Sequence, residues 1–219
     1  MPEPDLDAVV AALDRRYGRT FASEAGIRLE RNTPAPLFQL LVWSLLVSAR
    51  IRGDIATAAL RALVDAGLTT PQAMVEASWE ERTALLNGAG YARYDESTAR
   101  YLEATAQLLL HRDGGDLRRL RERAEGDRGV LVDELTEFTG IGEVGATTFL
   151  REVQAVWDEV GPVVDQRAAR AAEALGLPGD PDELRALVDD APAFARLVAA
   201  LVRCDLDDGA DAVLDDASG

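Results

Sequence analysis

Residues 138–150 read FTGIGEVGATTFL, and this short stretch interrupts helical sequence with Gly140, Gly142 and Gly145. Each glycine inside a helix costs roughly 1 kcal/mol relative to alanine, so the cluster predicts a sharp turn between two helices. Such a turn can bury Ile141 beneath it and leave backbone amides exposed at the start of the second helix. Amides at a helix N-terminus, with the positive end of the helix dipole, bind anions without a basic side chain. A turn that serves only close helix packing is the alternative interpretation.

The rest of the chain carries apolar residues at helical spacing and no sustained strand-like alternation. Residues 36–50 begin with proline and are apolar almost all round, which is typical of a central buried helix. Phe38, Trp43 and Trp157 are expected in the core. The pattern predicts an all-α protein. Further helices are expected at residues 6–17, 54–66, 95–110, 131–138, 146–157, 165–175, 184–188 and 193–202.

Composition narrows the class of protein. Hydrophobic residues make up 47% of the 219 residues, which is enough for a sizeable core. Cys204 is the single cysteine, so an intramolecular disulfide and a cysteine-ligated iron–sulfur cluster are both excluded. The acidic start lacks the apolar core of a signal peptide, and no run of 18 apolar residues occurs. We therefore expect a cytoplasmic protein with no membrane partner.

Charge is the unusual feature. The net charge is −16, and all 23 basic residues are arginines because the chain contains no lysine. A negative surface repels the phosphate backbone, so an anion-binding face must be local. Residues 179–219 hold 11 acidic side chains against 3 arginines. Residues 204–219 are accordingly expected to form an acidic, solvated and disordered tail.

Four segments, in the same order, resemble the endonuclease III-like helix-hairpin-helix DNA glycosylases. FTGIGEVGA resembles the family's hairpin, which reads LPGVGxKTA. Val-Val-Asp at residues 163–165 lies about twenty residues further on, where the family has Val-Asp before a helix. Residues 36–50 resemble the family's central helix, and LLNGAGYARY at residues 85–94 resembles the loop that carries its DNA wedge. Together they cover roughly residues 34–176.

The resemblance implies two all-helical lobes with a DNA-binding cleft between them. One lobe is expected at residues 31–156 and contains the hairpin. The other joins residues 1–30 to residues 157–203 and carries Asp165. The implied partner is double-stranded DNA, and the protein is expected to be a monomer.

Asp165 matches the family's catalytic aspartate. A carboxylate against C1′ of the sugar stabilises the positive charge that develops when an N-glycosidic bond breaks. An aspartate before QRAARAAEAL is also a good helix N-cap, and the two roles are compatible. The family's second catalytic residue, a lysine in the hairpin, corresponds to Val144. A monofunctional glycosylase without lyase activity is therefore expected.

The remaining implied site residues contact DNA. They are Gly140, Ile141, Gly142 and Gly145 of the hairpin, Arg50 in the gap left by the flipped base, and Tyr91 as the wedge. A solvated helix end is the alternative for Arg50, and packing against a neighbouring helix is the alternative for Tyr91. No metal or iron–sulfur cofactor is expected, although a monovalent cation at the hairpin is compatible with the resemblance.

Three functional hypotheses follow. The first is a monofunctional DNA glycosylase that removes a damaged or mispaired base. The second is a non-catalytic DNA-binding relative that recognises lesions or structures, and the missing lysine, the missing cluster and the −16 charge favour it. The third sets nucleic acid aside and assigns the acidic surface to protein partners. The sequence does not identify the base.

Overall fold

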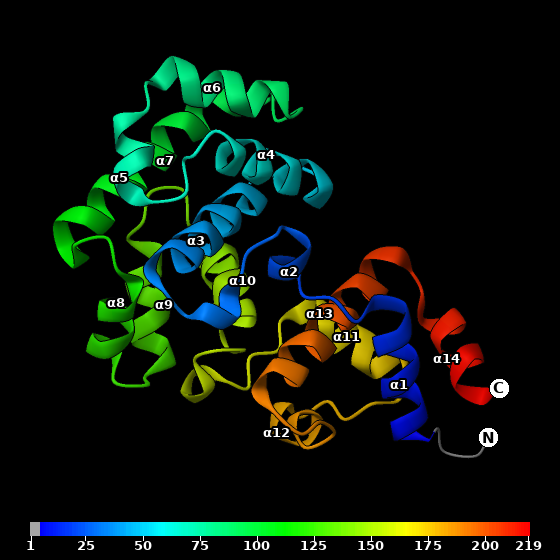
Figure 1. The fold of residues 1–219 in the computed structure, drawn as a ribbon. Coiled ribbons are helices and arrows are strands. Elements are labelled where there is room, and N and C mark those ends of the chain that lie inside the picture. The colour runs from blue at the N-terminus through cyan, green and yellow to red at the C-terminus, as the bar shows by residue number, and fades with distance from the viewer. Residues whose placement is uncertain (1–4) are drawn as a thin grey trace. The chain divides into compact units, whose positions relative to one another are not determined.

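The computed structural model describes residues 5–219, and all regular secondary structure in that range is helical (Figure 1). The expected all-α class is confirmed. None of these helices combines the length and the hydropathy needed to span a bilayer. In chain order they are α1 (Leu6–Tyr17), α2 (Phe21–Glu24), η1 (Leu29–Arg31), α3 (Pro34–Ser48), α4 (Gly53–Asp65), α5 (Pro71–Glu76), α6 (Trp79–Gly88), α7 (Asp95–Asp113), α8 (Leu117–Ala124), α9 (Arg128–Thr136), α10 (Glu143–Val153), η2 (Asp158–Val160), α11 (Gln166–Ala174), α12 (Pro181–Arg185), α13 (Ala191–Asp207) and α14 (Ala210–Ser218).

Two compact units make up the chain. The smaller unit combines Met1–Phe21 with Leu150–Gly219, and the larger unit is Ala22–Phe149. One boundary falls at the start of α2 and the other inside α10. The larger unit therefore begins and ends earlier in the chain than the lobe expected at residues 31–156. The second boundary comes early because side chains near the end of α10 bond to residues 163 and 165 of the smaller unit.

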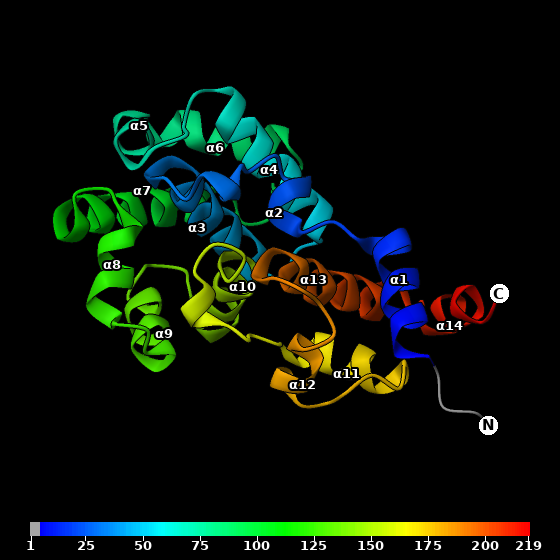
Figure 2. The ribbon, with the colours of Figure 1, turned by 60° about the horizontal axis from the view of Figure 1, so that its bottom comes forward.

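The larger unit is built around α3, which packs on α4, α7 and α8 (Figure 2). The helix is apolar on nearly every side because it is enclosed, as the sequence predicts. The side chains buried along it are Leu37, Phe38, Leu40, Leu41, Val42, Trp43, Leu45 and Leu46. Its central position makes α3 the support for the segments that pack on it, including the glycine-rich hairpin.

The smaller unit packs α13 against α11 and α1, with α14 also against α1 (Figure 1). Its core joins Leu13 of α1, Ala168 and Ala172 of α11, and Phe194 and Leu201 of α13. Alanines on α11 allow that helix to approach α13 closely. This packing fixes the start of α11, where Asp165 lies.

The disorder predicted for residues 204–219 is wrong. Helix α13 continues to Asp207, and α14 forms a further helix whose Val213 is fully buried. Asp216 forms an ion pair with Arg16 of α1 at 2.8 Å. The acidic composition hid a short amphipathic pattern, in which Ala210, Val213, Leu214 and Ala217 share one face at helical spacing.

Buried Arg82 joins three helices of the larger unit. Its side chain is 1% exposed, and its Nε donates to the carbonyl oxygen of Ala99 at 3.0 Å. Its Nη1 donates to the carbonyl oxygens of Met74 and Ala77, and its Nη2 pairs with Glu103. One guanidinium thereby satisfies carbonyl groups near the ends of α5 and within α7.

Arg82→Ala should lower the free energy of unfolding by about 3–5 kcal/mol, because it leaves buried acceptors without a donor. Arg52→Ala removes an exposed arginine, paired only with nearby Asp54, and should change the stability by less than about 0.5 kcal/mol. Urea denaturation of both variants measures the difference. Equal effects would show that the Arg82 contacts contribute little.

Candidate functional site

The glycine-rich stretch forms a turn between α9 and α10, as the sequence predicts. Gly140 has a φ of +88°, a conformation that side chains other than glycine rarely adopt. Phe138 and Ile141 are buried below the turn, and the Ile141 amide donates to the Phe138 carbonyl oxygen at 3.0 Å. Helix α10 begins at Glu143, directly after Gly142. The turn thus places a helix N-terminus beside a tight backbone loop.

Two helices of the larger unit, α3 and α7, pack against the turn. A Cβ atom on Gly140 would lie 3.0 Å from the ring of Tyr101 in α7. A Cβ atom on Gly145 would overlap the hydroxyl oxygen of Ser48 in α3. Thr105 of α7 also donates to the carbonyl oxygen of Thr139 at 3.1 Å. Gly140 and Gly145 are therefore required for close packing, which is the interpretation of the glycines that does not involve a ligand.

Gly142 differs from the other two glycines. A Cβ atom added to it meets no protein atom within 4 Å. The first helical bond past it runs from the Ala146 amide to the Gly142 carbonyl oxygen at 2.9 Å, so the preceding amides have no acceptor within the helix. Packing does not explain this glycine. Its place directly before the first helical residue, an N-cap position that glycine favours, does explain it, and the open space leaves room for a ligand.

The side chains at the start of α10 bear on what this site can bind. Val144 is 74% exposed. Glu143 is exposed beside it and places a negative charge at the same helix end. A carboxylate there interacts well with the helix dipole but competes with an incoming phosphate. A nearby cation would offset the negative charge of Glu143 for an anion at these amides.

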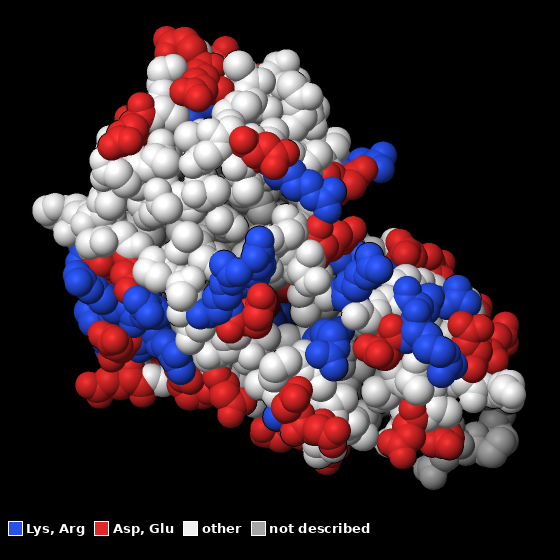
Figure 3. Space-filling view, viewed as in Figure 1, with Lys and Arg blue, Asp and Glu red and all other residues white. Residues whose placement is uncertain are grey.

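Arg50 is a cation suited to this role. It is exposed, it follows Ser48 of α3 by two residues, and it forms no ion pair or hydrogen bond with residues 5–219. Two arginines of α8 are paired with carboxylates instead. Arg118 pairs with Asp116 at 2.6 Å, and the pKa of Arg123 is raised by hydrogen bonds to Glu134 and Asp113. Figure 3 shows arginine and acidic side chains interspersed over α8 and α9.

Tyr91 does not fit the wedge role assigned to it. Its side chain is fully buried, and its hydroxyl donates to the Leu46 carbonyl oxygen at 2.8 Å. Burial also raises the pKa of Tyr91. Gly90, with a φ of +86°, turns the backbone so that the ring enters the core. The expectation of a DNA contact is therefore wrong for Tyr91 in this structure, and packing against a neighbouring helix is correct.

Asp165 lies at the start of α11 and uses both carboxylate oxygens. Its Oδ1 accepts from the amides of Arg167 and Ala168 at 3.0 and 2.9 Å, which makes it the N-cap. Its Oδ2 pairs with Nη1 of Arg151 at 2.5 Å. The side chain is only 16% exposed. The carboxylate is held in one orientation, and neither oxygen is open in this arrangement.

A polar cluster at the end of α10 supports Asp165. Gln154 is 1% exposed, accepts from the Val163 amide at 2.8 Å and donates to the Val163 carbonyl oxygen at 3.1 Å. Arg151 is 5% exposed and lies 4.9 Å from the centre of the Phe21 ring. Neither residue was predicted as part of a site. The available signal was a pair of polar residues, Arg151 and Gln154, at the buried C-terminal end of α10.

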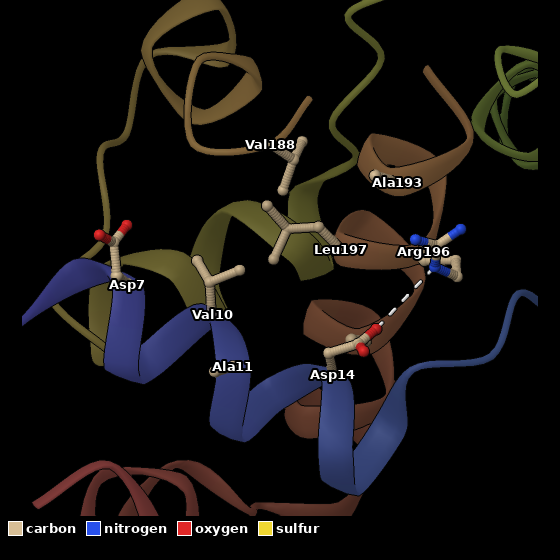
Figure 4. Close-up of a pocket in the computed structure, with 9 residues that line it drawn as sticks. Asp7, Val10, Ala11, Asp14, Val188, Ala193, Arg196 and Leu197 are labelled. Carbon is tan, nitrogen blue, oxygen red and sulfur yellow. Dashed lines mark ion pairs between the residues drawn. The ribbon is translucent and has the colours of Figure 1, made fainter. Parts of the chain in front are cut away.

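A hollow of about 260 Å³ between α1 and α13 has walls of Val10 and Leu197, with Asp14 and Arg196 3.9 Å apart at one end (Figure 4). Asp7 lies at its other end. Within residues 5–219, no group of three or more His, Cys, Asp or Glu side chains is arranged to hold a metal ion.

Comparisons with known proteins give a distant likeness to a solved structure. No protein-family model matches the chain, and no curated protein matches it. Among solved structures, the chain is similar to a trapped endonuclease III–DNA covalent intermediate, an estranged-adenine complex. The similarity covers 75% of this chain and 71% of that chain, with 17% sequence identity and a TM-score of 0.48. Values at this level assign neither residues nor an activity.

Gly140→Ala should destabilise the protein by about 1–3 kcal/mol, because the turn needs a positive φ and the ring of Tyr101 blocks a Cβ atom. Gly142→Ala should cost no more than about 1 kcal/mol, the effect of alanine at an N-cap position. Thermal unfolding of the two variants measures the difference. An equal loss in both would mean that Gly142 is also a packing residue.

Proposed function

We propose that this chain is a DNA-binding protein of the endonuclease III-like helix-hairpin-helix type, and that it is a monofunctional glycosylase. In this proposal the hairpin binds the backbone of double-stranded DNA, and Asp165 acts on the sugar of a damaged or mispaired base. The observation that carries the proposal is the fixed Asp165 carboxylate at the start of α11. The ordered match of hairpin, Val-Val-Asp and central helix supports it.

The chemistry assigned to Asp165 needs only a carboxylate. As the bond between base and sugar breaks, positive charge develops at C1′, and a nearby carboxylate stabilises it. The same group can orient the water that attacks this carbon. The target nucleotide must first leave the base stack, because its reacting atoms are shielded in the duplex. Hydrogen bonds from two amides hold the Asp165 carboxylate for this task without a change of rotamer.

Strand cleavage is not part of the proposal. A lyase step needs an amine nucleophile, and the corresponding side chain, Val144, is an exposed valine. The chain contains no lysine that could replace it. The product should therefore be an intact strand with an abasic site. The expected monomer, the cytoplasmic location, the lack of a resident metal or cluster and a monovalent cation at the hairpin remain proposals of the same kind.

A non-catalytic DNA-binding protein is the second candidate. The pairing of Asp165 with Arg151 favours it, because a neutralised carboxylate stabilises a cationic sugar poorly. Exposed Glu143 at the hairpin and the net charge of −16 also predict weak binding to phosphate. The two candidates differ in whether any base is released.

Incubation of excess protein with duplexes that carry uracil, alkylated, oxidised or mispaired bases should release one class of base. The abasic product should be revealed by alkali and should not be nicked before that treatment. Asp165→Asn should reduce release by at least about 100-fold, because the transition-state charge loses its partner. Unchanged release in this variant would refute the assigned role. Binding without release from any duplex would favour the second candidate.

Gly142→Val should weaken duplex binding by about 10-fold or more, because a side chain would separate the phosphate from the hairpin amides. Gly179→Val is the matched control, since Gly179 also has open space around it and lies outside the hairpin. Fluorescence anisotropy with a labelled duplex at low salt measures both. Equal affinities would remove the hairpin from the interface.

Arg50→Ala should weaken binding and make it less dependent on salt. Loss of one phosphate contact lowers the slope of log K against log salt by about 0.9. Titrations at several salt concentrations give the slope directly. An unchanged slope would mean that Arg50 is a solvated helix end.

A further inference from the structure

We propose that Arg151 restrains Asp165, so that the carboxylate acts on a sugar only after their ion pair opens. The proposal rests on the proposed function of Asp165 and adds a second residue that controls it. Arg151 touches no reacting atom in this scheme and is a positioning residue. Three observations on the smaller unit carry the inference.

The first observation is that the ion pair between Arg151 and Asp165 is short and largely buried. Oδ2 of Asp165 contacts Nη1 of Arg151 at 2.5 Å, and the two side chains are 16% and 6% exposed. Water screens such a pair weakly, so each charge largely cancels the other. A sugar cation that approached Asp165 would meet a carboxylate whose charge is offset by the adjacent guanidinium.

The second observation is that Oδ1, the other carboxylate oxygen of Asp165, is not free to act on a sugar in place of Oδ2. Oδ1 is already bound to two amides of α11, and moving it would break the N-cap of that helix. Oδ2 is therefore the oxygen that can be released without damage to the helix. Its release requires only that Arg151 moves.

The third observation is that the resting place of Arg151 leaves one donor unused. Its Nε is buried and makes no hydrogen bond within residues 5–219. Oε1 of Glu152 lies 3.6 Å from this Nε, which is within ion-pair distance but too long for a hydrogen bond. Buried donors are normally satisfied, so an unused one indicates that a second arrangement can bind better. A phosphate group offers oxygens that match a guanidinium.

These observations assign a selective role to the pair. A permanently free carboxylate would stabilise positive charge on any sugar that reached it. A carboxylate held by Arg151 does so only at the cost of opening the ion pair. The restraint therefore lowers the attraction of the site for a cationic sugar until the pair opens.

The test compares two duplexes that differ only in charge at the sugar position. One carries a pyrrolidine abasic nucleotide, whose ring nitrogen is cationic, and the other carries the neutral tetrahydrofuran nucleotide. The wild-type protein should prefer the cationic duplex by less than about 3-fold, because the carboxylate is neutralised. Arg151→Met, which keeps an apolar stem against Phe21, should raise the preference to about 10-fold or more.

Three further variants separate the causes. Arg151→Met combined with Asp165→Asn should lose the gained preference, since the carboxylate is its source. Arg151→Lys keeps the charge and should stay near the wild-type ratio. Arg203→Met is the matched control, because the Arg203 guanidinium also lies against the Phe21 ring, at 4.1 Å, but forms no ion pair with Asp165. It should leave the ratio unchanged.

Each outcome decides between the proposals. A wild-type preference of 10-fold or more would overturn the restraint, and this measurement needs no variant to fold. Equal ratios in wild type and Arg151→Met, with intact thermal unfolding and tight binding, would also overturn it while DNA binding stands. Failure of the wild-type protein to bind either duplex in low salt would refute the proposed function, and the restraint with it.

Discussion

The contact of α10 with α3 at Gly145 is the constraint on which the rest of the larger unit depends. Without a side chain at this position, the start of α10 can lie against Ser44 and Ser48. That approach fixes the turn before it, and Gly140 completes the turn by adopting a positive φ against Tyr101. The buried α3 gives this arrangement a rigid base. The exposed amides at the turn are a consequence of packing, and Gly142 keeps them accessible.

Several arginines of this protein form hydrogen bonds or ion pairs with groups of their own unit. Arg82, Arg118, Arg123 and Arg151 all bond to carbonyl groups or carboxylates of their own unit. Arginine suits this use because its planar group donates several hydrogen bonds at fixed angles. Arg50 is different, since it is exposed and lies close in sequence to the hairpin support. A protein of net charge −16 can therefore still present an exposed cation locally.

Asp165 has a structural role as the N-cap of α11, and the proposed chemical role is compatible with it. Its two bonds to amides stabilise α11, and they also fix the orientation that a catalytic carboxylate needs. The ion pair with Arg151 adds stability but removes the free negative charge. The two candidate functions differ in whether this pair is permanent. The Gln154 clamp on Val163 keeps the approach to Asp165 rigid in either case.

The sequence alone determined the helical class, the buried α3, the hairpin turn and the N-cap at Asp165, because each depends on local spacing or on single residues. Only the tertiary structure decided which charges are free. The Arg151–Asp165 pair joins positions 14 residues apart, and no helical period predicts it. Tyr91 enters the core for a similar reason, since its acceptor on Leu46 is 45 residues away. The acidic composition of the last residues predicted disorder, whereas apolar residues at helical spacing form a helix that buries Val213. Long-range contacts of this kind depend on where whole helices pack, which a single sequence does not record.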